Sequence, residues 1–220
     1  GSGGRTRVKT SRGRSAQSTR WLERQLNDPY VRAAQQQGLR SRAAFKLIGL
    51  DDKYRLLRPG ARVLDLGAAP GGWTQVAVER TAPNGRVVAV DLLPMDPVPG
   101  AVAIQGDFQD EAVAAAALEA LGGPADVVVS DMAPNTTGHT GTDHLRIMGL
   151  AELALASALE ALAPDGAFVA KVFQGGGERT FLDALKRAFR AVRHAKPPAS
   201  RKDSSELYVV ATGFRGRGEG

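Results

Sequence analysis

The stretch VLDLGAAPGGW, residues 63–73, decides the fold of this chain. An apolar run typical of a buried strand leads into a loop of small residues and then into a predicted helix near 72–80. Gly67, Gly71 and Gly72 remove Cβ atoms where the chain must turn, so backbone N–H groups and the helix N-terminus can face a carboxylate or phosphate. The spacing differs from the G-x-G-x-x-G fingerprint and Pro70 would crowd a pyrophosphate, which disfavours a nicotinamide cofactor. A tight turn without any ligand is the alternative.

Around this stretch, β-type and helical segments alternate along one continuous unit. We expect further helices near 110–121, 144–162 and 178–189, and strands at 62–66, 86–91, 101–107, 126–131, 167–173, 191–196 and 207–213. Such a βαβ series predicts a doubly wound α/β fold with a mostly parallel seven-stranded sheet flanked by helices. We expect a single domain over 17–214, with its core at 59–214 and flexible ends at 1–16 and 215–220.

Charge is divided unevenly along the chain. Residues 1–60 carry 14 basic and 4 acidic side chains, net +10, whereas residues 61–220 carry 15 and 19, net −4. A cationic segment favours a polyanion because neutralising phosphates releases condensed counterions. Nucleic acid is therefore the expected partner of residues 17–58, although a solvated tail is an equal alternative for the first sixteen residues.

Two helices are predicted in this basic segment, separated at Asp28-Pro29 because the residue before proline is disfavoured in helical geometry. The first begins near Ser18, and Trp21 within it is expected in the core or at a cap rather than as a platform for base stacking. Ser41 is the expected N-cap of the second, SRAAFKLIGLDDKY. On that helix Arg42, Lys46 and Lys53 would form a cationic stripe.

Carboxylates follow two neighbouring predicted strands. Asp91 ends RVVAVD, 24 residues after Gly67, where an acid can accept both hydroxyls of a ribose. Asp107 ends the next strand and could accept the exocyclic amine of adenine or act as a helix N-cap. With the glycine loop, these strand ends predict a site for adenosine attached to a small charged group.

Five motifs make the sequence resemble the FtsJ/RrmJ family of ribosomal RNA large-subunit 2′-O-methyltransferases over residues 20–214. They are Asp28-Pro29-Tyr30-Val31 with Arg40 to Leu47, Asp65 to Trp73, Ser130 to Asn135, Lys171 to Gly175, and Ser204 to Tyr208. The resemblance implies S-adenosylmethionine as cofactor and a catalytic tetrad of Lys46, Asp131, Lys171 and Glu206. The cofactor pocket is then expected at Gly67, Gly71, Trp73, Asp91, Asp107 and Asp131. RNA contacts are expected at Arg40, Arg42, Lys46 and Lys53.

The resemblance also implies a target, a uridine in the A-loop of large-subunit ribosomal RNA within the assembled subunit. A monomer in a bacterial cytoplasm is expected, with an organellar location left open. Target choice should come from RNA shape, because no base-reading motif is visible.

The tetrad is also chemically reasonable from the residues alone. Lys171 lies within an apolar strand, and a buried ammonium calls for carboxylates such as Asp131 and Glu206. A purely structural ion-pair network is the alternative. Lys171 would either accept the proton of the ribose hydroxyl or orient that hydroxyl, Lys46 would position the hydroxyl or a phosphate, and Glu206 would orient one lysine.

Several other classes are disfavoured. The chain has no cysteine, and its three histidines lack zinc-type spacing, so we expect no structural metal. No apolar run reaches eighteen residues, so no membrane partner is expected. A small-molecule or protein methyltransferase would leave the basic segment unexplained. A ribosome-assembly factor without turnover, or an enzyme acting on another RNA, remains the alternative function.

Overall fold

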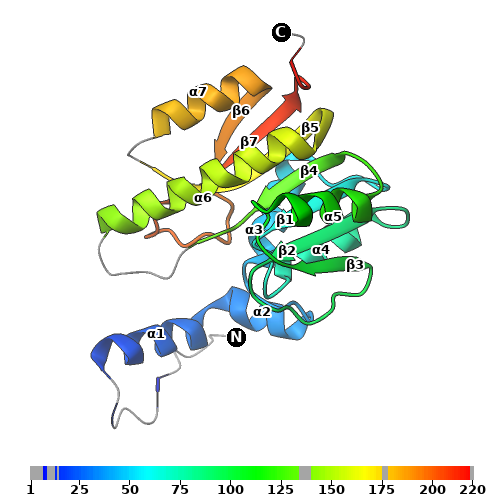
Figure 1. Cartoon of the computed structure of the whole chain (residues 1–220). Helices are drawn as coiled ribbons and strands as arrows, with labels where there is room; N and C mark the ends of the chain where they lie inside the picture. The colour runs from blue at the N-terminus through cyan, green and yellow to red at the C-terminus, as the bar shows by residue number, and fades with distance from the viewer. Residues whose placement is uncertain (1–6, 9–12, 14, 134–139, 175–177, 219–220) are drawn as a thin grey trace.

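A computed structural model describes residues 7–8, 13, 15–133, 140–174 and 178–218, which form a three-layered α/β unit with two helices extending from it (Figure 1). The sheet order is β3-β2-β1-β4-β5-β7-β6. The strands are β1 (Arg62–Leu66), β2 (Arg86–Asp91), β3 (Ala101–Gln105), β4 (Ala125–Ser130), β5 (Leu162–Phe173), β6 (Phe189–Ala195) and β7 (Glu206–Phe214). The helices are α1 (Ala16–Asn27), α2 (Pro29–Gln36), α3 (Ala44–Tyr54), α4 (Gly72–Thr81), α5 (Glu111–Leu121), α6 (Thr140–Ala161) and α7 (Glu178–Ala188).

Two hydrophobic layers hold the sheet. Because side chains alternate along a strand, Val63, Val127 and Val169 face α3 and α4, whereas Leu64, Val128 and Phe168 face α5, α6 and α7. Both faces of the central strands are covered, as expected for strands that are nearly continuous apolar runs. The predicted doubly wound fold is confirmed.

The direction of β7 determines which residues meet at the edge of the sheet. Strands β1 to β5 pair in parallel, whereas β7 runs antiparallel to both β5 and β6. The first residue of β7 therefore lies at the edge where the parallel strands end. In the β5–β7 pairing, Lys171 is opposite Tyr208 and Phe173 is opposite Glu206.

Some local expectations were wrong. The N-cap of α3 is Ala43, without a side-chain cap hydrogen bond, because Ser41 instead packs against Gly72, where an added Cβ would lie 2.6 Å from its Oγ. Helix α6 begins at Thr140, four residues earlier than expected. Trp21 is 56% exposed and belongs to neither core cluster.

Parts of other expectations lie outside the described residues. These are most of the tail over 1–16, the last two residues, and Pro134, Asn135 and Gly175 of the matched motifs.

Candidate active site

A cavity of about 450 Å³ opens at the carboxyl ends of the central strands. The chain turns back at the junction of β1 and β4, and ligands of open α/β sheets bind at such a switch point. Gly67, Asp91, Asp107 and Asp131 all line this cavity. The structure thus brings together four of the six residues expected around a cofactor.

Gly67 is required by both its backbone and its surroundings. Its φ is +69°, and an added Cβ would lie 2.1 Å from Cγ of Met132. Asp91 supports the same loop, since its Oδ2 accepts a hydrogen bond from the Ala69 N–H at 2.8 Å and its Oδ1 accepts one from Leu93 at 2.9 Å. A carboxylate has about four acceptor positions, so Asp91 retains capacity for the hydroxyls of a ligand.

Asp107 does not cap the following helix. The N-cap of α5 is Asp110, whose side chain accepts from the Ala112 N–H. Asp107 accepts one hydrogen bond, from the Gln109 N–H at 2.9 Å. The cap alternative is therefore wrong, and the carboxylate on the cavity wall has acceptor capacity for a ligand amine.

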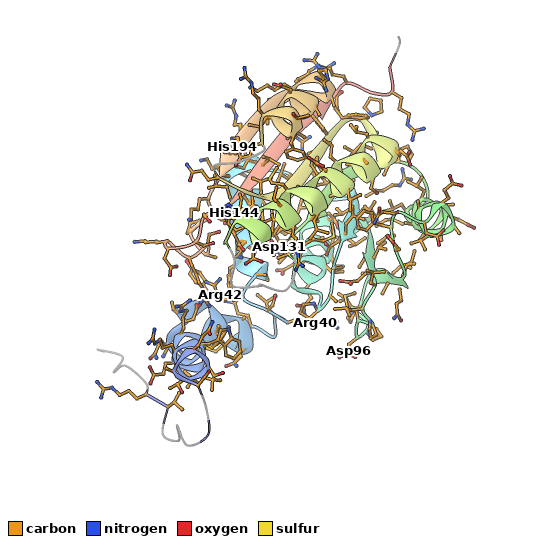
Figure 2. The ribbon with its side chains drawn as sticks, turned by 60° about the vertical axis from the view of Figure 1, so that its left-hand side comes forward. Arg40, Arg42, Asp96, Asp131, His144 and His194 are labelled. Carbon is orange, nitrogen blue, oxygen red and sulfur yellow. The ribbon has the colours of Figure 1, made fainter. Side chains whose placement is uncertain are left out.

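The other two expected cofactor residues, Gly71 and Trp73, do not contribute to the cavity wall. At Gly71, φ is +115° and an added Cβ would lie 3.2 Å from Arg40, whose guanidinium donates to the carbonyls of Pro70, Asp96 and Pro97. Figure 2 shows Arg40 beside Asp96. Gly71 thus makes room for an arginine that braces the loop from outside.

Trp73 packs in the α3 and α4 layer behind the loop. It is 4% exposed, its ring lies 5.7 Å from that of Tyr208, and its Nε1 donates to the Ala43 carbonyl at 2.7 Å. Its role in this structure is to fix α3 against the loop between β1 and α4.

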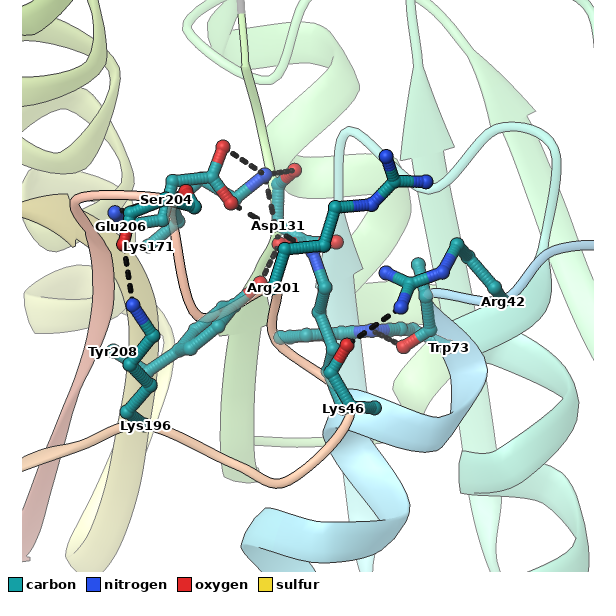
Figure 3. Close-up of polar contacts among 12 residues, drawn as sticks. Arg42, Lys46, Trp73, Asp131, Lys171, Lys196, Arg201, Ser204, Glu206 and Tyr208 are labelled. Atoms are coloured by element: carbon teal, nitrogen blue, oxygen red, sulfur yellow. Dashed lines mark hydrogen bonds and ion pairs between the residues drawn. The ribbon is translucent and has the colours of Figure 1, made fainter. Parts of the chain in front are cut away.

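The four residues expected as a tetrad are in contact (Figure 3). Lys171 Nζ lies 3.1 Å from Asp131 Oδ1 and 3.7 Å from Glu206 Oε1, and Lys46 Nζ lies 3.7 Å from Glu206 Oε2. Lys171 and Glu206 come from neighbouring antiparallel strands, Asp131 follows β4, and Lys46 is on α3. The lysine side chains are only 7% and 11% exposed, so each ammonium depends on these carboxylates.

Tyr208 is a member of this network that the sequence analysis missed. Its hydroxyl donates to Asp131 Oδ1 at 2.5 Å, and burial raises the pKa of Tyr208 well above its usual value, so the hydroxyl keeps its proton. Its position two residues after Glu206 on β7 was the available signal, because alternate residues of a strand share a face.

The two lysines differ in their acidity. Burial lowers the pKa of Lys171, but Asp131 and Glu206 together outweigh this effect and raise it above 10.5. For Lys46, burial dominates and lowers the pKa, Asp131 opposes this effect, and the charge of Lys171 adds to it. Lys46 is therefore the lysine that loses its proton more readily.

Asp65 is a second missed residue. It is 1% exposed, and Thr74 Oγ1 donates to its Oδ2 at 2.8 Å. Burial raises the pKa of Asp65 to about 7, against the effect of this hydrogen bond and with smaller contributions from Asp131 and Asp91. A buried carboxylic acid thus lies beneath the loop between β1 and α4.

The expected cationic stripe is not a uniform surface of one helix, because α3 begins at Ala44 and Arg42 precedes it. Arg42 pairs with Asp28 at 2.7 Å and donates to the Ala199 carbonyl, and Lys46 belongs to the tetrad. Lys53 is exposed, with its ammonium 5.4 Å from the Tyr54 ring centroid. Asp28 also pairs with Arg201 at 3.2 Å, so it joins the start of α2 to the loop before Glu206.

Across the part of the chain that the structure describes, no group of three or more His, Asp or Glu side chains could hold a metal ion. None of the described helices combines the length and apolar character needed to cross a bilayer.

Known proteins with similar sequences are methyltransferases of one family. Residues 39–214 match the model of the FtsJ-like methyltransferase family. A curated relative from Acidiphilium cryptum, named ribosomal RNA large subunit methyltransferase E, is 67% identical over 95% of this chain and 92% of its own length. A protein of the same name from Granulibacter bethesdensis is 66% identical, covering 96% of this chain and 91% of its own.

A solved structure also supports the assignment. A chain described as a ribosomal RNA methyltransferase of Plasmodium falciparum is 33% identical and superposes with a TM-score of 0.72, covering 81% of this chain and all of that one. A methyltransferase fold, a cavity at its switch point and a tetrad beside that cavity accompany these similarities. The chain belongs to the FtsJ-like methyltransferase family.

Proposed function

We propose that this protein transfers a methyl group from S-adenosylmethionine to a ribose 2′-hydroxyl of large-subunit ribosomal RNA, at the A-loop uridine. The observation that carries the proposal is the position of Asp131, which lines the cavity and also lies 3.1 Å from Lys171. A donor in the cavity and an acceptor held by the lysines would thus be adjacent. Relatives named as large-subunit RNA methyltransferases, 66–67% identical, support this substrate.

The residues around the cavity fit the cofactor. Gly67 allows close approach of a ligand, and Asp91 and Asp107 provide acceptors for the ribose hydroxyls and the adenine amine. When bound, S-adenosylmethionine supplies a methyl group on a positively charged sulfur. Gly71 and Trp73 would act from behind, by shaping the loop.

The chain's own groups position the acceptor and receive its proton. Lys171, kept protonated by Asp131 and Glu206, orients the 2′-oxygen by donating a hydrogen bond. As the new oxygen–carbon bond forms, the hydroxyl proton passes toward Lys46, the lysine whose pKa is lowered by burial, and then to water. Glu206, whose carboxylate oxygens lie 3.7 Å from the Nζ atoms of both lysines, fixes the positions of the two side chains relative to each other.

We place the RNA along the basic N-terminal part, residues 17–58, of a single unit that ends near 214. Arg40 is bonded only to neutral carbonyls among its described partners, so its charge can still attract a phosphate, and Lys53 is exposed. Arg42 would contribute less because Asp28 neutralises it. We further propose that the protein acts as a monomer in a bacterial cytoplasm, with an organelle as the alternative.

The test is methyl transfer from labelled S-adenosylmethionine to purified, unmethylated large ribosomal subunits. Lys171→Met should abolish incorporation, whereas Lys186→Met, at an exposed position of α7, should leave it unchanged. The label should map to a ribose 2′-oxygen of the A-loop. Cofactor binding without transfer to subunits or free ribosomal RNA would overturn the proposal in favour of an assembly role.

The division of labour between the lysines predicts a pH dependence. Because burial lowers the pKa of Lys46, the rate of methyl transfer in a single turnover should rise with pH through that lowered value. Lys46→Met should be slow and lack this rise. A Lys46→Met enzyme that keeps the full pH dependence would show that another group accepts the proton.

A further inference from the structure

Helix α1 leaves most of its side chains uncovered. None of its twelve residues, all of which are described, is buried. Figures 1 and 2, seen from two directions, both show the helix extending away from the sheet and its covering helices. Helix packing within this chain therefore does not explain its composition.

One face of α1 combines an aromatic ring with two cations. Arg24 follows Arg20 by four residues and Trp21 by three, so the side chain of Arg24 lies between those of Arg20 and Trp21 on one side of the helix. Each is exposed, and Trp21 is 56% accessible. Glu23, the one acidic residue of α1, is directed elsewhere, since its carboxylate is within 3.5 Å of the Val8 N–H.

The surroundings of Trp21 also suit a planar polar ligand. A hollow beside the indole is lined by Ser15, Gln17, Ser18 and Leu22. Hydroxyl and amide groups thus lie next to an aromatic ring, on a helix that also carries the exposed Arg20 and Arg24. These are the groups that hold an unpaired base and its phosphates.

The helix is attached to the rim of the catalytic site. Asp28 ends α1 and begins α2, and it pairs with Arg42, four residues before Lys46, and with Arg201, five residues before Glu206. Trp21 lies seven residues before Asp28, about 10 Å along the helix axis. A strand of RNA entering the site could therefore reach α1.

We propose that α1 is a second RNA contact, in which an unpaired base of the substrate stacks on Trp21 and its flanking phosphates meet Arg20 and Arg24. This inference rests on the proposed function, because it assigns the helix to the RNA substrate. The positive charge favours RNA over a protein as the partner, since residues 1–60 carry a net charge of +10 and the exposed face of α1 is cationic.

The test compares steady-state methylation of unmethylated large subunits by wild type, Trp21→Ala and Trp21→Phe. Trp21→Ala should raise KM for subunits about tenfold and leave kcat unchanged, and Trp21→Phe, which keeps a stacking face, should stay within about twofold of wild type. Leu26→Ala is the matched control, because Leu26 is 48% exposed but points about 140° away around the helix. An unchanged KM in Trp21→Ala, or equal losses in all three variants, would overturn the proposal.

A second readout separates this proposal from the reaction. Titration with single-stranded oligouridylate should quench the tryptophan fluorescence of wild type. The fluorescence of Trp21→Phe should stay unchanged, because its remaining tryptophan, Trp73, is buried. Absence of quenching refutes stacking even if methylation proceeds, whereas quenching without methylation refutes only the proposed function. A photoreactive benzoylphenylalanine in place of Trp21 should crosslink to ribosomal RNA, and a crosslink to ribosomal protein alone would contradict the assignment.

Discussion

Replacing the buried acid Asp65 by its neutral analogue should make the protein more stable at neutral pH. Asp65 is 1% exposed and its pKa is raised by burial to about 7, compared with 3.8 in an exposed chain. In the folded protein it is therefore protonated at pH values where the unfolded chain has already lost that proton. The stabilisation is fully present below pH 3.8 and is lost as the pH rises through 7.

The magnitude follows from the two pKa values. Each pH unit between them removes about 1.4 kcal/mol of stability, so the loss is about 1.5 kcal/mol at pH 5 and about 4 kcal/mol at pH 8. Asp65→Asn keeps the shape and can still accept the hydrogen bond from Thr74, but it does not ionise. The difference in unfolding free energy between variant and wild type should therefore change by about 2.5 kcal/mol between pH 5 and pH 8, in favour of the variant.

Urea unfolding at both pH values, without cofactor, measures this difference. The control is Asp183→Asn, at an exposed position of α7, which removes a carboxylate without burial. A gap between Asp65→Asn and wild type that is the same at pH 5 and pH 8 would refute the argument, because it would mean that Asp65 titrates alike in the folded and unfolded chains.

Two further substitutions test the site. Gly67→Ala should weaken S-adenosylmethionine binding at least tenfold by calorimetry, because φ of Gly67 is +69° and the added Cβ would lie 2.1 Å from Met132. The control is Gly149→Ala, whose Cβ would have no described atom within 4 Å. This variant should bind the cofactor normally and gain up to about 1 kcal/mol of stability. Tyr208→Phe should lower the unfolding free energy, measured in urea, by about 1–2 kcal/mol and should reduce kcat, because Asp131 loses a buried hydrogen-bond donor. A variant with unchanged stability and kcat would show that this hydrogen bond contributes to neither.

The sheet was predictable because strong local patterns determine it, whereas the tetrad depends on contacts between distant parts of the chain. The runs RVLDL, RVVAVD and DVVVSD are apolar on both faces, which only a sheet covered on both sides accommodates. Lys46 and Glu206 are 160 residues apart, and no local pattern brings them together. Their pairing followed from the family resemblance, and the antiparallel direction of β7 explains it physically.

The structure departs from the local expectations for different reasons at different residues. Ser41 has a good capping side chain but packs against Gly72, which is distant in sequence, and Asp107 lies three residues before Asp110, the N-cap that α5 uses. Trp73 follows the glycine loop in sequence, yet its ring turns to the α3 layer. Trp21 was expected in the core or at a cap, and only the position of α1 shows that its side chain is exposed.

In the proposed reaction, the charge balance of the tetrad would link cofactor binding to proton transfer. Lys46 and Lys171 carry two positive charges and Asp131 and Glu206 two negative ones, so the group is neutral when all four are ionised. Positive charge brought into the adjacent cavity, whose wall includes Asp131, leaves the group with an excess of one. The pKa of Lys46, already lowered by burial, must then fall further, because repulsion destabilises its charged form. In the proposed reaction, a bound donor would therefore favour the deprotonated form of Lys46 that accepts the hydroxyl proton, whereas a phosphate arriving without the donor would favour the protonated form.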